Sequence, residues 1–96
     1  MHGVQISSEA EADLVNAVTY YELAKPGLGD QFINEFKSLL ARIASNPRQY
    51  RRFATGRKGL LKRFPYVVIY KFDVHTVYVI GVLHGKRSIR FMRRRY

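Results

Sequence analysis

Cysteine is absent from this sequence of 96 residues, and long apolar runs are absent as well. Without cysteine there is no disulfide framework and no metal site built on thiolates. No apolar stretch approaches the roughly 18–20 residues that a membrane-spanning helix needs. Residues 1–5 lack a charged segment followed by an apolar run, which an export signal would have. We therefore expect a cytoplasmic protein with one domain over residues 1–96 and no membrane partner.

The signatures of several enzyme classes are also missing. No glycine-rich loop follows a strand and opens a helix, which argues against phosphate-loop and dinucleotide-binding proteins. The three histidines, His2, His75 and His84, have no second histidine or carboxylate at the spacing of metal ligands. Six of the seven acids fall on predicted helices at cap-like or solvated positions, which disfavours a catalytic carboxylate pair. We expect no metal and no cofactor.

Acidic residues are scarce in the second half of the chain. Residues 1–46 hold six acids and three bases, whereas residues 47–96 hold fourteen bases and only one acid, Asp73. The net charge of +10 is therefore concentrated rather than scattered. Such a field destabilises a small domain by self-repulsion, and it favours an anionic partner such as nucleic acid, an acidic protein segment or a membrane surface. The simpler alternative is a basic protein that its charge keeps in solution.

Two helices are predicted in the first half. Ser8 fits a helix N-cap, with Glu11 three positions later as its capping-box partner, and apolar residues recur with helical spacing to about residue 24. Pro26-Gly27 ends this helix. A second helix follows, with an apolar stripe at Phe32, Phe36, Leu39, Leu40 and Ile43, and it ends at Asn46-Pro47. The short break between the helices predicts an antiparallel helical hairpin, which needs a sheet to cover its apolar face.

Two long runs of β-branched and aromatic residues predict a central β-hairpin: 63–72 and 76–87, joined by the short loop 73–75. Both runs are apolar on both faces, with Tyr78, Ile80 and Val82 predicted opposite Val77, Val79 and Leu83. Shorter strands are predicted at 4–7, 50–53 and 60–64, and a flexible turn at 55–59. We expect the basic tail 88–96 to form a short helix or to be disordered until bound. The fold class is α+β: an N-terminal strand and a helical hairpin packed on a mostly antiparallel sheet of three to five strands.

The basic residues next to His84 allow one enzymatic interpretation, which is cleavage of RNA. Cleavage through the 2′-hydroxyl needs a base, a cation for the phosphorane charge and an acid for the leaving oxygen. Arg87 and Lys86 could supply the charge, and His84 or Tyr96 could carry the proton. The alternative for a lone histidine at a strand end is a structural hydrogen bond. The tyrosines could stack bases, although Tyr21, Tyr66 and Tyr70 also suit the helix–sheet core.

Six segments in order resemble the RelE/ParE superfamily of bacterial toxins, and the resemblance covers nearly the whole chain, from about residue 6 to residue 87. The segments are Glu9–Leu14, Tyr20–Glu22, Pro26–Phe32, Asn46–Pro47, Arg63–Tyr70 and Val82–Arg87. The resemblance implies a helical hairpin on a mostly antiparallel sheet, with the first strand beside the last. It also implies a type II toxin neutralised by a cognate antitoxin whose C-terminal segment wraps the toxin.

The superfamily has two functional branches. The RelE branch resembles a ribosome-dependent endoribonuclease, and its pattern places an arginine directly after the tyrosine of the central strand. Here Val67 follows Tyr66, and Arg93 stands where the RelE pattern has a tyrosine. Only the arginine at the end of the last strand, Arg87, matches. The Phe-Pro-Tyr and Leu-His-Gly-Lys-Arg signatures instead look like the ParE or plasmid-stabilisation branch, whose members inhibit DNA gyrase.

We therefore predict a ParE-like gyrase inhibitor, with an mRNA endoribonuclease and a weakly toxic basic binding module as alternatives. The partners are an acidic antitoxin, in a toxin–antitoxin hetero-oligomer, and gyrase, or the ribosome and mRNA in the alternative. The predicted target or nucleic-acid contacts are Lys86, Arg87, Arg90, Arg93, Arg94 and Arg95. The predicted antitoxin contacts are Leu14, Val18, Tyr21, Phe36, Arg63 and Tyr70. If the protein is a ribonuclease, the catalytic candidates are Arg87, Lys86, His84 and Tyr96.

Overall fold

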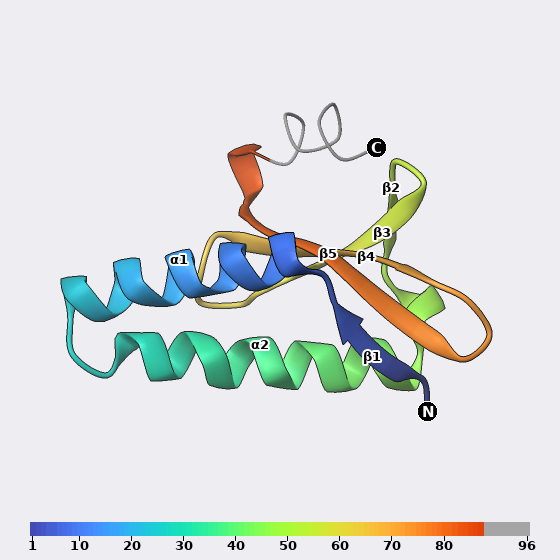
Figure 1. Ribbon diagram of the computed structural model, residues 1–96, viewed down its shortest axis with the longest axis horizontal. Helices are drawn as coiled ribbons and strands as arrows, with labels where there is room; N and C mark the ends of the chain where they lie inside the picture. The colour runs from blue at the N-terminus through green and yellow to red at the C-terminus, as the bar shows by residue number, and fades with distance from the viewer. Residues whose placement is uncertain (88–96) are drawn as a thin grey trace.

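A computed structural model of the chain describes residues 1–87 and shows two helices packed on one face of a five-stranded sheet (Figure 1). The element order is β1 (Gly3–Ile6), α1 (Ser8–Ala24), α2 (Leu28–Ser45), the short 3-10 helix η1 (Pro47–Gln49), β2 (Arg51–Phe53), β3 (Gly56–Leu60), β4 (Tyr66–Phe72), β5 (Thr76–His84) and the 3-10 helix η2 (Gly85–Arg87). The strands lie in the order β1-β5-β4-β3-β2. Among the strands of residues 1–87, only the β1–β5 pair is parallel. The predicted α+β class is confirmed, including the first strand beside the last.

The helical hairpin forms as predicted, but its first cap is one residue earlier. Ser7, not Ser8, is the N-cap of α1, and its side-chain oxygen accepts a hydrogen bond of 3.0 Å from the backbone N–H of Ala10. The turn between the helices is closed by Glu22, whose carboxylate accepts the N–H groups of Gly27 and Gly29. Gly27 has φ of 90°, a conformation that glycine adopts without strain.

The core lies between the helices and the sheet. The predicted stripe of α2 is buried there, except that Leu40 is only half-buried. It packs against Val68 and Tyr70 of β4 and against Val77, Val79 and Val82 of β5. Burial of a branched or aromatic side chain of this size is worth about 1.5–3 kcal/mol, so this interface supplies most of the driving force for folding.

A β-bulge decides which residues of β5 reach that core. The pairing of β4 with β5 shifts between Ile69 and Tyr70, which leaves Ile80 as an extra residue on β5. The alternation resets at this point, so Val82 faces the helices and Leu83 faces away. Val82 therefore shares its face with Val77 and Val79, and Leu83 shares its face with Ile80, so the predicted grouping of Val82 with Ile80 and of Leu83 with Val79 was wrong. Simple period-two counting cannot locate a bulge.

The face of the sheet away from the helices carries a second apolar cluster. Val67 and Ile69 are buried there, packed with the half-buried Phe53, Ile80 and Leu83. This arrangement agrees with the prediction that the central hairpin is apolar on both faces.

The region between residues 54 and 65 differs from the prediction. The turn is confined to Ala54 and Thr55, and the segment predicted as a flexible turn belongs mostly to β3, which pairs with β4. Gly59 is in this strand because α2 passes close by: a Cβ there would lie 3.1 Å from Leu39.

The strand predicted at residues 60–64 forms only at Leu60, the last residue of β3, and residues 61–65 form a loop instead. Leu61 and Phe64 anchor the loop in the core, and the Glu35 carboxylate accepts the backbone N–H groups of Lys62 and Arg63. These backbone donors therefore bond to a side chain of α2 rather than to a neighbouring strand.

One buried hydroxyl joins the helical half of the chain to the sheet. Tyr70 is fully buried, and its hydroxyl donates a hydrogen bond of 2.7 Å to the carbonyl oxygen of Pro47. Burial raises the pKa of Tyr70 to about 12, although the nearby charge of Arg57 acts in the opposite direction. The phenol is therefore a neutral donor that fixes η1 against β4.

Candidate functional site

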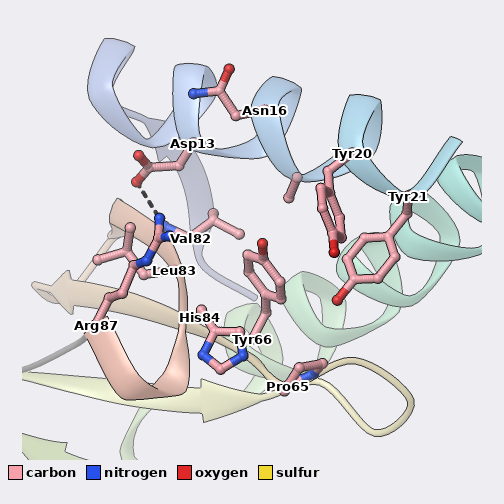
Figure 2. A pocket seen from close by; sticks show the side chains of 11 residues that line it. Asp13, Asn16, Tyr20, Tyr21, Pro65, Tyr66, Val82, Leu83, His84 and Arg87 are labelled. Carbon is pink, nitrogen blue, oxygen red and sulfur yellow. Dashed lines mark hydrogen bonds between the residues drawn. The ribbon is translucent and has the colours of Figure 1, made fainter. Parts of the chain in front are cut away.

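A surface pocket of about 590 Å³ lies between α1 and the end of β5. Figure 2 shows α1 side chains along one wall and Tyr66, His84 and Arg87 facing them from the other. The lining residues are Asp13, Asn16, Ala17, Tyr20 and Tyr21 of α1, Pro65 and Tyr66, and Val82, Leu83, His84 and Arg87. Parallel pairing of β1 with β5 places α1 beside this end of β5, so the pocket follows directly from the topology.

Aromatic rings form the floor of the pocket. The ring of Tyr66 lies 5.9 Å from that of Tyr21 and 5.7 Å from the imidazole of His84, in both cases edge to face. Burial raises the pKa of both phenols, and the charge of Arg87 partly opposes the rise at Tyr66. Both hydroxyls are therefore protonated at neutral pH and available as hydrogen-bond donors.

The hydrogen bond at His84 defines what its imidazole can do. Its Nδ1 accepts the backbone N–H of Lys86 at 3.2 Å, so the proton of the neutral ring is on Nε2. In this form Nε2 is a donor. Acting as a general base at Nε2 would require the proton on Nδ1, where it would face the Lys86 N–H. The structure thus favours the structural and binding interpretation of His84 over the catalytic one.

Asp13 joins α1 to the strand beneath it. Its Oδ2 accepts the backbone N–H of Val82 at 3.1 Å, and the side chain of Arg87 points toward it (Figure 2). A guanidinium, an Nε2–H donor and two neutral phenols around one pocket can hold an anionic group. The pocket therefore offers donors for an anionic group, and such a group would compete with the Asp13 carboxylate for the guanidinium of Arg87.

The structure brings only some of the predicted site residues together. Arg87 and His84 line this pocket, whereas Lys86 is exposed beside a neighbouring apolar pocket formed with the 60–67 segment. The remaining predicted contacts lie outside the described residues: Arg90, Arg93, Arg94, Arg95 and Tyr96.

The predicted antitoxin contacts need correction at two positions. Phe36 and Tyr70 are buried in the core, where they cannot touch a partner, because each packs between α2 and the sheet. Leu14, Val18 and Tyr21 are half-buried, and Arg63 is exposed. The exposed apolar side chains of α1 are instead Val15, Tyr20 and Leu23, which are 59%, 66% and 84% exposed.

Sequence reasoning missed the α1 side of the pocket. Asp13, Asn16 and Tyr20 are spaced i, i+3, i+7, which places them on one face of a helix, and this polar stripe was the available signal. Their position opposite His84 depends on the β1–β5 pairing, which the residue pattern alone does not reveal.

Neither a cluster of potential metal ligands nor a membrane-spanning helix occurs among residues 1–87. That part of the chain has no group of three or more histidine, cysteine, aspartate or glutamate residues that could hold a metal ion. Among its helices, none combines the length and apolar character needed to cross a membrane.

The hairpin-on-sheet fold, with the first strand parallel to the last, is that of the RelE/ParE class of small toxins. A solved structure described as the chromosomal ParDE TA system from P. aeruginosa has the same fold, with a TM-score of 0.75 and 13% identity over 88% of this chain and 96% of that chain. No curated protein sequence matches this chain significantly. The model of the family described as ParE toxin of type II toxin-antitoxin system, parDE, matches residues 4–89, and the chain belongs to that family.

Proposed function

We propose that this protein is a toxin that inhibits DNA gyrase and is neutralised by an acidic antitoxin encoded beside it. Membership of the ParE family supports the toxin class. The observation that favours gyrase over the ribosome and mRNA as the target is the residue at position 67. Val67 stands where the RelE pattern has an arginine. Val67 is 2% exposed and belongs to the apolar cluster on the outer face of the sheet. An RNA-cleaving cation is therefore absent from that position.

The anion-binding pocket is the proposed contact with gyrase or the gyrase–DNA complex. Arg87 is exposed at its rim, and Tyr66 and His84 line the pocket beside it as hydrogen-bond donors. A hydrogen bond to a charged group is worth about 1.5–3 kcal/mol, so loss of the guanidinium should weaken the contact about tenfold or more.

The test is supercoiling by purified gyrase with the full chain added at micromolar concentration. We expect inhibition by the wild type, about tenfold weaker inhibition by Arg87→Gln, and unchanged inhibition by Lys37→Gln, which makes the same charge change on the exposed side of α2. Unaffected gyrase would refute the proposal. Primer extension on translated mRNA after induction is the companion assay, and cleavage there would show an endoribonuclease instead.

The antitoxin is proposed to cover the exposed apolar side chains of α1 and the edge strand β1. Val4 and Ile6 of β1 are 38% and 36% exposed, and Val15 and Leu23 are the exposed aliphatic side chains of α1. An acidic amphipathic segment suits such a surface at the edge of a basic protein. Leu23→Glu should abolish rescue of growth by the neighbouring gene, whereas Val74→Glu, at a position 82% exposed in the β4–β5 loop, should not. Absence of growth arrest when the chain is expressed alone would favour a weakly toxic binding module.

A further inference from the structure

The β2–β3 hairpin places like charges directly opposite one another. Arg51 pairs with Lys58, and Arg52 pairs with Arg57, so both charged pairs of this short ladder are cation against cation. Like charges at such positions destabilise a sheet, each by a few tenths of a kcal/mol up to about 1 kcal/mol. The hairpin therefore carries a local electrostatic cost that an anionic ligand would offset.

Two of these cations, Arg52 and Arg57, gather with two further bases around a pocket. The pocket measures about 500 Å³, and its charged lining residues are Arg48, Arg52, Arg57 and Lys71. The guanidinium carbons of Arg48 and Arg57 lie 5.5 Å and 5.6 Å from the centre of the Phe72 ring. None of the residues that line this pocket is acidic. We call the five bases of η1, β2 and β3, namely Arg48, Arg51, Arg52, Arg57 and Lys58, the β2–β3 basic surface. It extends around the edge of the sheet, because Arg51 and Lys58 project from the opposite face to Arg52 and Arg57.

Arg57 is fixed in place before any ligand arrives. Its Nη1 donates to the carbonyl oxygens of Arg48 and Tyr50, at 3.0 Å and 2.8 Å. Both bonds use the same nitrogen, so the other guanidinium hydrogens have no protein acceptor among residues 1–87. A guanidinium held in this way loses little side-chain entropy when it binds a phosphate.

The surroundings of this surface favour a nucleic acid over an acidic peptide. No acid occurs between Glu35 and Asp73 in the sequence, so the field along β2 and β3 has one sign. Apart from Leu60, the exposed large apolar side chains lie elsewhere, on α1, on the β1 edge and in the β4–β5 hairpin. An amphipathic peptide needs apolar anchors, whereas a phosphodiester backbone needs cations and hydrogen-bond donors. Arginine also forms paired hydrogen bonds to phosphate.

We propose that the β2–β3 basic surface binds the phosphodiester backbone of nucleic acid. Because β2 is the edge strand opposite β1 in the sheet order, this surface is distinct from the proposed antitoxin edge. It is also distinct from the Arg87 pocket, with which it shares no lining residue. Binding of this kind is independent of gyrase inhibition and stands whether or not gyrase is the target.

The test is fluorescence anisotropy of a labelled duplex of about 20 base pairs, with the purified full chain and NaCl from about 50 to about 200 mM. The variant is Arg48→Gln/Arg52→Gln, which spares Arg57 because Arg57 supports the backbone. The control is Lys25→Gln/Lys37→Gln, two exposed bases of the helical half with the same total charge change. Urea unfolding verifies that each variant folds, and the Arg48/Arg52 variant should be at least as stable as the wild type because a repulsion is removed.

We expect the Arg48/Arg52 variant to bind at least tenfold more weakly at about 0.1 M salt, with the slope of log K against log salt reduced by about two. The control should change affinity less than about threefold. Equal losses in both variants would overturn the proposal, since that result means bulk attraction to a basic protein. A glutamate-rich peptide is added as a competitor. If it competes as effectively as the unlabelled duplex, compared per negative charge, the proposal is overturned in favour of an acidic protein partner. A single-stranded RNA of matched length identifies which nucleic acid binds more tightly.

Discussion

Asp73 illustrates how one exposed carboxylate can close a hairpin. Its Oδ1 accepts the backbone N–H groups of His75 and Thr76, at 2.9 Å and 2.8 Å, and its Oδ2 accepts the hydroxyl of Tyr78 at 2.9 Å. The His75 N–H, followed by the Tyr78 hydroxyl and the Thr76 N–H, lowers the pKa of Asp73. These same bonds to Asp73 explain why the loop between the two predicted strands is only three residues long.

The lowered pKa of Asp73 makes part of the stability depend on pH. Because the pKa is lower in the folded than in the unfolded chain, the contribution is present above the unfolded value and is lost as pH falls through the folded value. Asp73→Asn keeps an acceptor oxygen but does not titrate. Urea midpoints from about pH 6 to about pH 3 should therefore fall less steeply for Asp73→Asn than for the wild type.

The control for this prediction is Asp30→Asn, which makes the same charge change on an exposed residue of α2. Its midpoints should follow the wild-type pH profile. Parallel profiles for Asp73→Asn and the wild type would show that the three hydrogen bonds to Asp73 do not distinguish its charged from its neutral form.

At the scale of elements, the helical hairpin depends on a close approach of α1 to α2 at Gly29. A Cβ at Gly29 would lie 2.9 Å from Oε1 and 3.0 Å from Cβ of Glu22, and 3.1 Å from a methyl carbon of Val18. The Glu22 Cβ is fixed to the helix backbone, so the contact cannot be relieved by rotating a side chain alone. The same Glu22 carboxylate holds the turn at Gly27, which couples the packing to the cap.

Gly29→Ala is therefore expected to destabilise the protein even though alanine favours helices. The gain in helix propensity is at most about 1 kcal/mol, whereas overpacking costs about 1–3 kcal/mol. The net loss should be about 1 kcal/mol in the free energy of unfolding, measured by urea denaturation. Gly3→Ala is the matched control, because its Cβ would meet only the His75 carbonyl oxygen at 3.8 Å. A Gly29→Ala protein as stable as the control would contradict the proposed clash.

The elements that the sequence predicted correctly are those whose signal is local. The helical stripe from Phe32 to Ile43 and the break at Asn46-Pro47 depend on spacing and on proline, and both were found. β3 was missed because Gly56 and Gly59 indicate a turn, although Gly59 is needed to let α2 approach. The 61–65 segment has strand-like composition, but its backbone donors bond to Glu35, a residue far away in sequence.

The candidate site was predictable in part for the same reason. Arg87 and His84 lie three positions apart in a basic segment at the end of a predicted strand, so the local sequence pattern indicated both. Tyr66 and Asp13 reach the same pocket from other elements, and their meeting depends on the parallel β1–β5 pair and on the bulge in β5. Register and bulges are set by tertiary packing, which a pattern within one segment does not encode.

At the scale of the whole molecule, charge and apolar surface are separated across the sheet. The described chain exposes apolar side chains along β1 and α1 at one edge, whereas the β2–β3 basic surface occupies the other edge. A protein with this distribution can in principle engage an amphipathic acidic segment and a polyanion at the same time. This distribution lowers the stability of the folded chain, because the bases of the second half repel one another and are the source of the net charge of +10.

This repulsion predicts that salt stabilises the folded protein. Raising NaCl from about 0.05 to about 0.5 M shortens the screening length to a few ångströms, so the urea midpoint should rise. Arg51→Glu converts the Arg51–Lys58 pair into an attractive one and should stabilise the protein by about 0.2–1 kcal/mol at low salt, with a smaller rise on adding NaCl. Lys37→Glu makes the same charge change on α2 and separates a local effect from a global one. If Lys37→Glu stabilises the protein as much as Arg51→Glu does, the repulsion arises from the net charge rather than from the β2–β3 ladder. If the urea midpoint of the wild type falls as salt is added, neither source of repulsion limits the stability.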